Sequence, residues 1–234
     1  MERFKSTEGE TPYQIKDSFL QTLKTLSPTY GAVLDKISEK LNEVPPSGAM
    51  AGIYSMVDST RGVWKAPANV SIAMVSKPSV NVSQVEQADL NVDVITGKSI
   101  NVIREFPNVG TIVWGGRTLD GNSLDWRYIN VRRTLMMIDQ SLKLATLAYV
   151  FEPNDANTWV TVKSMISNFL TNLWKQGALA GATPEEAFDV QIGLGATMTP
   201  TDVLEGIMLI SVKVAVVKPA EFIVITFQQK LQQS

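Results

Sequence analysis

The sequence of 234 residues contains neither cysteine nor histidine. Without cysteine, the chain forms no disulfide and has no thiolate nucleophile. Without histidine, it cannot assemble a Ser-His-Asp or Cys-His catalytic group, and it lacks the imidazole base that works near neutral pH. The two absences also remove the usual ligands of transition-metal sites. Carboxylate, lysine or tyrosine chemistry remains, but the composition argues against an enzyme, and we expect no metal and no other cofactor.

A strong charge of one sign and long apolar runs are also missing. Lysine and arginine number 21 against 23 acidic residues, a net charge of −2, so there is no basic field of the kind that nucleic acids require. No apolar run approaches the roughly 18 residues of a membrane-spanning helix, and the polar start lacks the apolar region of a signal peptide. We therefore expect no nucleic-acid partner and no direct membrane insertion.

Helical and strand patterns alternate along the chain. The first 44 residues predict two amphipathic helices, which follow Thr11 and Ser27 and have a proline at their first position. Further helices are predicted at 49–58, at 130–145, from a cap at Asn154 or Asp155 to Gln176, and at 200–205. Strands are predicted at 100–103, from 110, at 148–151, at 207–217 and at 221–231. This order predicts an α/β (α+β) fold with a mixed β-sheet flanked by helices.

The stretch "TGKS" (96–99) has the letters that end a phosphate-binding loop. Val92 stands where the first glycine of that loop belongs, and the segment that follows is strand-like, whereas phosphate binding needs a helix N-terminus. A turn at Gly97 is the simpler interpretation.

Acidic side chains form a second candidate site. They could pair as general acid and base or bind Ca²⁺ or Mg²⁺, but their spacing matches no metal loop, and acidic residues at a helix start are favoured by the helix dipole. The candidates are Asp120, Asp125, Glu152 and Asp155. Helix capping is the simpler explanation for the last two.

Arginines are clustered more distinctly. The cluster comprises Arg104, Arg127, Arg132 and Arg133. With Trp126 and Tyr128 they could stack on bases, but the acidic balance of the chain favours arginine–carboxylate pairs at a protein interface. A carboxylate- or lysine-dependent enzyme with a pocket near the tryptophans remains an alternative, and only the aromatic content supports it.

The stretch "TRGVWKAPAN" (60–69) predicts a stiff corner. Gly62 ends the preceding helix, and Pro67 biases the residue before it towards extended structure. Trp64 then packs between that helix and the sheet, while Arg61 and Lys65 can reach carboxylates. We expect structural anchors at Trp64, Trp114 and Trp126. We expect interface charges at Arg61, Lys65, Arg132 and Arg133.

The last two predicted strands contain "VKVAVV" and "FIVITF", which are apolar and β-branched. As free edges they would promote aggregation. Either they lie in the centre of this domain's own sheet, or another chain adds a strand to them through main-chain hydrogen bonds. The pattern alone leaves both possibilities open.

Several blocks, in order, resemble the C-terminal part of contractile phage tail sheath proteins. They are "SGAMAGIYSMVDSTRGVWKAPAN", "GTIVWGGRTL", "WRYINVRR", "VFEPNDANTWVTVKSMISNFLTNLWKQGALAGATPEEAF" and "TPTDVLEGIMLISVKVAVVKPAEFIVITF". The resemblance is closest to the sheaths of phage-tail-like extracellular contractile injection systems, such as antifeeding prophage and Photorhabdus virulence cassette particles. It covers residues 45 to 234.

The resemblance implies a structural subunit without catalysis. Such subunits stack as hexameric rings around an inner tube, and the sheath contracts to drive the tube through a target envelope. The implied partners are other sheath subunits, the inner tube protein, and the baseplate and cap or terminator proteins. Assembly is implied in the cytoplasm of the producing bacterium, as part of a phage tail or a tail-like particle that can be released. The alternative is a binding module that accepts a partner strand without polymerising.

The resemblance also assigns residues. The inter-subunit strand arm is expected at 221–231, and its residues are Glu221, Phe222, Ile223, Val224, Ile225, Thr226 and Phe227. A tube contact is expected on the short helix at 200–205, through Thr201, Asp202 and Glu205. Because family members are usually much longer, residues 1–44 are expected to be a helical segment that belongs or leads to an upstream region. Residues 45–234 are expected to form the inner C-terminal domain.

Overall fold

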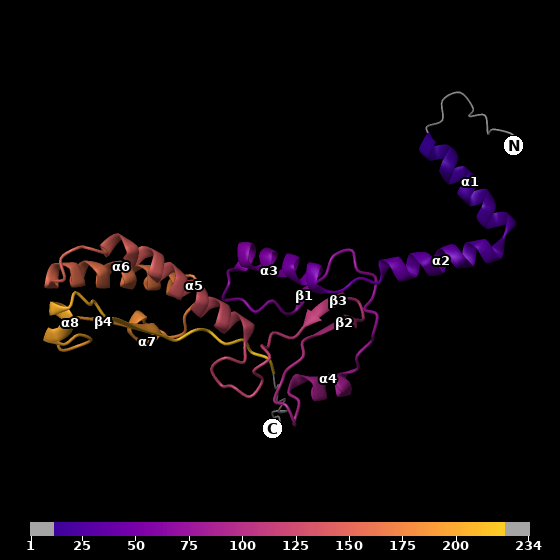
Figure 1. Ribbon diagram of the computed structural model, residues 1–234. Coiled ribbons are helices and arrows are strands. Elements are labelled where there is room, and N and C mark those ends of the chain that lie inside the picture. Colours follow the sequence, from indigo (N-terminus) through magenta and orange to yellow (C-terminus); the bar gives the residue numbers. More distant parts are fainter. Residues whose placement is uncertain (1–11, 223–234) are drawn as a thin grey trace, which may run out of the picture. The chain divides into compact units, whose positions relative to one another are not determined.

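The computed structural model describes residues 12–222 (Figure 1). The chain divides into two compact units, with the boundary between Gly48 and Ala49. None of the helices in the described range is both long and apolar enough to cross a membrane. We describe each unit by itself.

The first unit contains two helices, as the sequence predicts. They are α1 (Pro12–Leu26) and α2 (Pro28–Asn42). Ser27 is the N-cap of α2, where its hydroxyl accepts a hydrogen bond from the Tyr30 amide at 3.3 Å. No residue of α2 is buried, so the apolar side of this helix faces solvent.

The second unit has two cores, and the first lies around a three-stranded sheet. The strands are β1 (Val70–Ser71), β2 (Val102–Phe106) and β3 (Gly110–Trp114), all antiparallel in the order β1-β3-β2. Helix α3 (Ser47–Arg61) packs Ile53 and Val57 against Val113 of the central strand. Helix α4 (Gln84–Asn91) precedes β2 and begins with a capping box at Ser83.

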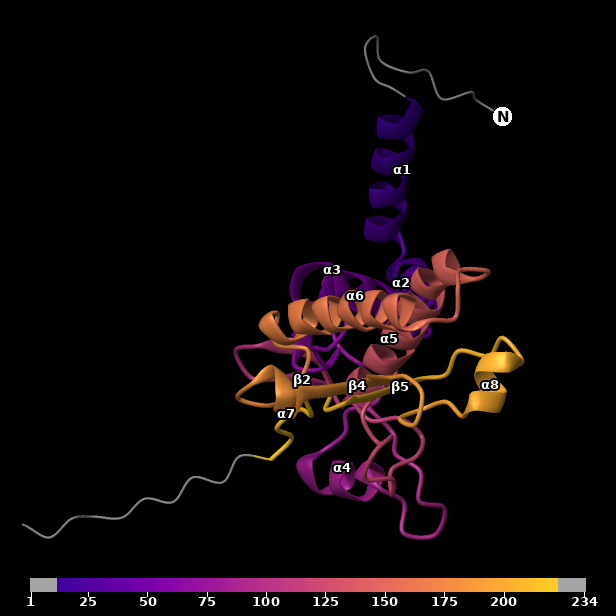
Figure 2. The ribbon, with the colours of Figure 1, turned by 90° about the vertical axis from the view of Figure 1, so that its left-hand side faces the viewer.

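The second core lies between two long helices and a two-stranded sheet (Figures 1 and 2). The helices are α5 (Ile129–Thr146), extended by the 3₁₀ turn η1 (Leu147–Tyr149), and α6 (Ala156–Lys175). The short helices are α7 (Pro184–Ala187) and α8 (Pro200–Leu204). The sheet pairs β4 (Phe188–Ile192) with β5 (Ile210–Val214) in antiparallel register.

Helix α6 supplies most of the apolar surface of this core. Asp155 caps it by accepting the Thr158 amide at 3.0 Å. Val162, Ile166 and Leu170 recur every four residues and are at most 1% exposed, the pattern of a helix that turns one face to a core. A two-stranded sheet alone is marginally stable in water, so β4 and β5 depend on this helix.

The α+β fold class is confirmed, with one difference in the sheets. Among the described residues, the strands form two small antiparallel sheets rather than one mixed sheet. The last described strand is also shorter than the predicted 207–217, because its ends continue as irregular segments. The expected strand at 221–231 lies outside the described residues from 223 onward.

The strand predicted at 148–151 is wrong. This segment continues α5 as the turn η1 and then ends at Phe151, whose φ of +72° is incompatible with a strand. Val150 and Phe151 are exposed. Their apolar side chains predict a strand, but in the described residues these side chains do not pack into either core.

The phosphate-loop alternative is also not supported. Residues 96–99 form a turn, in which Gly97 has a φ of +68° and the Asp93 carboxylate accepts the amides of Ile95 and Thr96. The next element after Ser99 is the strand β2, not a helix, so the amides that would hold a phosphate are not assembled.

We expect Leu170→Ala to lower the free energy of unfolding of this unit by about 2–5 kcal/mol, because it opens a cavity where the buried face of α6 packs into the second core. The matched control is Val160→Ala on the same helix, where the side chain is 65% exposed and the change is expected to stay within about 0.5 kcal/mol. Chemical denaturation followed by circular dichroism measures both. Equal effects would contradict the assignment of this face to the core.

Candidate functional site

The candidate site is the place where the C-terminal part of the chain leaves the second core. We call residues 215–222 the exit segment. The Ala215 amide donates to the Ala187 carbonyl at 2.8 Å, and the Ala180 amide donates to the Ala215 carbonyl at 2.7 Å. The Val217 amide donates to the Ala178 carbonyl at 3.3 Å. These bonds extend the pairing of β5 and hold the first part of the exit segment to the domain.

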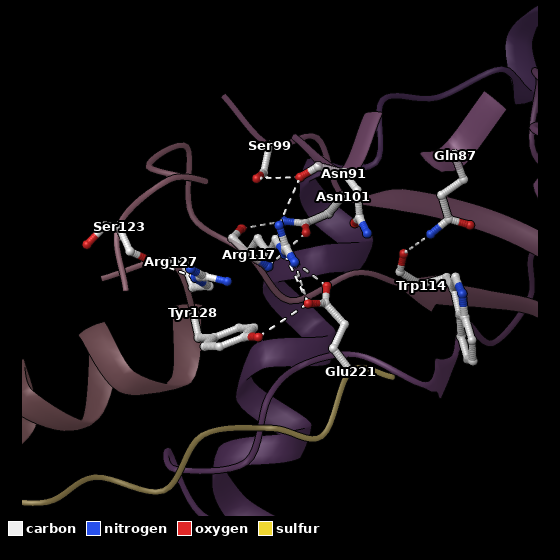
Figure 3. Close-up of polar contacts among 10 residues, drawn as sticks. All are labelled: Gln87, Asn91, Ser99, Asn101, Trp114, Arg117, Ser123, Arg127, Tyr128 and Glu221. Carbon is white, nitrogen blue, oxygen red and sulfur yellow. Dashed lines mark hydrogen bonds and ion pairs between the residues drawn. The ribbon is translucent and has the colours of Figure 1, made fainter. Parts of the chain in front are cut away.

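A buried ion pair holds the far end of the exit segment (Figure 3). Arg117 Nη2 lies 2.6 Å from Glu221 Oε2, and Arg117 Nε lies 2.9 Å from Glu221 Oε1, so the guanidinium binds the carboxylate in a bidentate manner. Tyr128 Oη donates to the same carboxylate at 3.3 Å. The side chains of Arg117 and Glu221 are only 8% and 20% exposed, which shields the pair from solvent.

The surrounding chain fixes the position of Arg117. Its amide donates to Asn101 Oδ1 at 2.9 Å, while Asn101 Nδ2 donates to the Arg117 carbonyl at 2.7 Å. A further guanidinium nitrogen donates to the Asn91 carbonyl at 3.3 Å. Hydrogen bonding to Glu221 raises the pKa of Arg117 above its ordinary value. The arginine is therefore a permanently charged, pre-positioned receptor for one carboxylate.

Asn130 links the exit segment to the corner that follows α3. This side chain is 2% exposed, and its Nδ2 donates to the Trp64 carbonyl at 2.9 Å and to the Val217 carbonyl at 3.0 Å. One amide at the start of α5 thus joins three segments that are distant in sequence. The exit segment is held by strand pairing, by this amide and by the Arg117–Glu221 pair.

The structure places the three predicted anchors in different surroundings. Trp64 is partly buried against the second core, and its ring covers Gly62, where a Cβ atom would lie 2.4 Å from the ring. Trp114 is partly buried beside Phe106, with ring centroids 4.9 Å apart. Trp126 is 41% exposed and lies under the guanidinium of Arg132 at 4.9 Å. Because the loop before α5 holds it at the surface, Trp126 is not a buried anchor.

The predicted interface charges divide into two kinds. Arg133 is already paired within the chain, because its guanidinium binds Asp58 through two hydrogen bonds, one of them 2.7 Å long. Arg132 is exposed and stacks on Trp126. Within residues 12–222, no ion pair is recorded for Arg61 or Lys65. Only these last two, with Arg132, keep their charge available to another molecule.

The predicted tube-contact residues lie on α8, away from the exit segment (Figure 1). Thr201 and Glu205 are exposed. Asp202 closes a capping box, in which its carboxylate accepts the Thr199 amide at 2.8 Å, and this hydrogen bond lowers the pKa of Asp202 below its ordinary value. The structure does not bring α8 together with the other predicted residues, and its tube contact stays a prediction.

Only the start of the predicted strand arm can be placed. Glu221 is bound by Arg117, and Phe222 is 71% exposed. Residues Ile223 to Phe227 lie outside the described residues. Glu221, expected to be part of the arm, is in the structure bound to the domain by Arg117, and the arm itself stays a prediction.

Sequence reasoning missed Arg117 and Asn130. Arg117 follows two glycines after a buried strand, and its partner is 104 residues away, so no local spacing could connect them. The only sequence feature that could have identified Arg117 is its place as a single arginine in an otherwise apolar and glycine-rich block. No sequence feature identifies Asn130, because an asparagine at a helix start is ordinarily explained by capping.

We expect Arg117→Met to detach the exit segment without unfolding the core. The change leaves Glu221 partly buried without its partner, at a cost of about 1–3 kcal/mol. Hydrogen exchange should accelerate at Val217, the last amide of the exit segment that donates to the domain, and remain slow in α6. Lys218→Met is the control, since its ammonium group is exposed and makes a single bond to the Leu124 carbonyl. Unchanged exchange in the arginine variant would contradict a holding role for the pair.

Comparison with known proteins shows a match to one family over part of the chain. Residues 122–230 match the phage tail sheath C-terminal domain. The tail sheath protein of Vibrio phage KVP40 is 25% identical over 207 residues, which are 88% of this chain and 29% of that protein.

Solved structures agree with the sequence match. The helical sheath of the anti-feeding prophage in its contracted state is 48% identical, with a TM-score of 0.73 over 80% of this chain and 51% of that one. The sheath complex of the extracellular contractile injection system PVC, also contracted, is 46% identical, with a TM-score of 0.75 and the same coverage. The chain thus spans about half the length of these sheath chains. Residues 122–230 are thus similar to the phage tail sheath C-terminal domain, and the wider chain is similar to solved sheath chains, which confirms the resemblance found in the sequence.

Proposed function

We propose that this chain is a structural subunit of a contractile sheath. It polymerises as hexameric rings around an inner tube, and contraction of the sheath drives the tube through a target envelope. The observation that carries the proposal is the likeness of four-fifths of the chain, at 48% identity, to a helical sheath solved in its contracted state. The role is structural rather than catalytic, in keeping with relatives that are sheath proteins.

An open strand edge supports assembly by strand addition. Ala215 bonds to Ala187 of the β4 side, and main-chain groups alternate along a strand. The amides and carbonyls of Val212 and Val214 therefore point away from β4. Within the described residues, β5 has no partner on that side. A strand from a neighbouring subunit can complete the sheet there.

The exit segment supports the complementary half of this contact. Its residue Glu221 is held at a fixed point of the domain by Arg117, and the apolar residues "FIVITF" (222–227) follow Glu221 directly. A strand that leaves from a fixed base reaches its partner with less loss of conformational entropy than a strand on a loose linker. We propose that Phe222 to Phe227 form the arm that pairs with the next subunit.

Further partners follow from the same role. One solved relative is part of an anti-feeding prophage baseplate with six-fold symmetry, which supports a baseplate contact for this chain. The inner tube, through Thr201, Asp202 and Glu205, and a cap or terminator protein complete the proposed set. Assembly takes place in the cytoplasm of the producing bacterium, and the product is a tail or tail-like particle.

We expect Val212→Pro to abolish assembly while the monomer stays folded. Proline removes an amide that faces the open edge and leaves the bonds to β4 in place. Val212→Ala is the matched control, because it removes the same apolar contact but keeps the amide. Electron microscopy and analytical ultracentrifugation detect sheath-like tubes or rings, and circular dichroism checks the fold. Normal tubes from the proline variant would argue against strand addition at β5.

A variant that lacks residues 223–234 distinguishes two functions: a sheath subunit that polymerises, and a binding module that does not. The shortened chain should fold and stay monomeric, because it offers an edge but no arm. Mixed with the full chain, it should shorten the tubes by capping their growing ends. If the full chain itself binds one partner strand and remains monomeric at high concentration, the binding module is the correct function.

A further inference from the structure

A polar hollow of about 330 Å³ lies beside the exit segment. Its walls come from the end of α3, the corner at residues 64–66, Asn130, Gly177 and residues 217–220. The exit segment thus forms one side of this hollow, and Asn130 connects it to the corner at Trp64 on another side. A group bound here lies beside the segment from which the proposed arm continues.

Three cationic side chains line the hollow, and no acidic one does. They are Arg61, Lys65 and Lys218. The carboxylates at the ends of the same elements are already used: Asp58 of α3 binds Arg133, and Glu221 of the exit segment binds Arg117. The carbonyls at the C-terminal end of α3 offset part of the charge of Arg61. The hollow nevertheless carries an excess of positive charge within the described chain.

This excess charge has an energetic cost in the free subunit. Partial burial lowers the pKa of Lys65, and repulsion from Arg61 lowers it further. Two like charges that share a partly desolvated site are stabilised when an anion enters between them. A carboxylate fits this requirement, because it accepts hydrogen bonds from both a guanidinium and an ammonium group.

We propose that this hollow binds an aspartate or glutamate side chain of a neighbouring copy of the same chain, in the assembled sheath. The inference rests on the proposed function. A second copy is the occupant because the hollow adjoins the arm that reaches that copy, and because the chain carries more acidic than basic residues. The contact makes the start of the arm part of the subunit interface, so that the neighbouring copy is held by the arm and also by charge pairing beside the segment from which the arm leaves.

Zero-length cross-linking tests the occupant directly. Carbodiimide joins an amine to a carboxylate only when the two are in contact. Sheaths assembled from a one-to-one mixture of ¹⁴N- and ¹⁵N-labelled full-length chains should give Lys65 cross-links that contain one light and one heavy peptide. Cross-links of Lys65 only within single chains would overturn the proposal. So would the absence of any Lys65 cross-link in sheaths whose other intersubunit links form.

Acylation of Lys65 gives an independent readout. The lowered pKa makes its amine reactive in the free subunit at mildly alkaline pH, and a bound carboxylate raises that pKa and covers the group. We expect at least tenfold slower acylation of Lys65 in sheaths than in monomers, while exposed Lys77 reacts equally in both. Protection of monomeric Lys65 by acetate at millimolar concentration, with no protection on assembly, would mean a site for free anions and would overturn the proposed occupant.

Charge reversal completes the test. The double variant Arg61→Glu and Lys65→Glu should stay folded and fail to assemble, whereas Lys77→Glu should assemble normally. Normal assembly of the double variant would overturn the pocket contact alone, since strand addition would then suffice. If the unmodified chain forms no sheath, the proposed function fails first and the pocket contact with it. The two failures are therefore distinguishable.

Discussion

Burial of one face of α6 is the constraint on which the functional surface depends. A pair of strands does not hold together in water by itself, and β4 and β5 have no third strand among the described residues. Val162, Ile166 and Leu170 are buried in a core to which this sheet and α5 both contribute. The helix stabilises the sheet from one side, so an edge of β5 can remain unpaired. Within the described residues, this sheet is therefore packed on one face and incomplete at one edge.

The exit segment obeys a different kind of constraint. Its contacts are polar and directional: strand bonds at Ala215 and Val217, the amide of Asn130, and the pair of Arg117 with Glu221. Such contacts add less stability than apolar burial, but they specify one position and one direction. Apolar packing thus maintains the domain, and polar contacts determine where the following residues begin.

Local sequence signals predicted the ends of helices well where a residue with a known capping or helix-ending role stands at the end of an apolar pattern. Asp155 caps α6, Ser27 with Pro28 begins α2, and Gly62 ends α3. The same signals failed at residues 148–151, because an exposed apolar run resembles a short strand until its backbone angles are known. The fold class and family were predictable from ordered blocks. The site was less so, since Arg117 and Glu221 meet only through the tertiary fold.

The antiparallel bonds at the base of the arm have a mechanical consequence. If tension acts along the exit segment in the direction of β5, the bonds at Ala215 and Val217, the Asn130 amide and the Glu221 carboxylate stretch together in shear. A strand pulled sideways from a sheet breaks its bonds one after another, whereas bonds in shear share the force and rupture at much higher tension. The segment therefore resists traction as a single unit, and a pull on it is passed through Asn130 into α5 of the same domain.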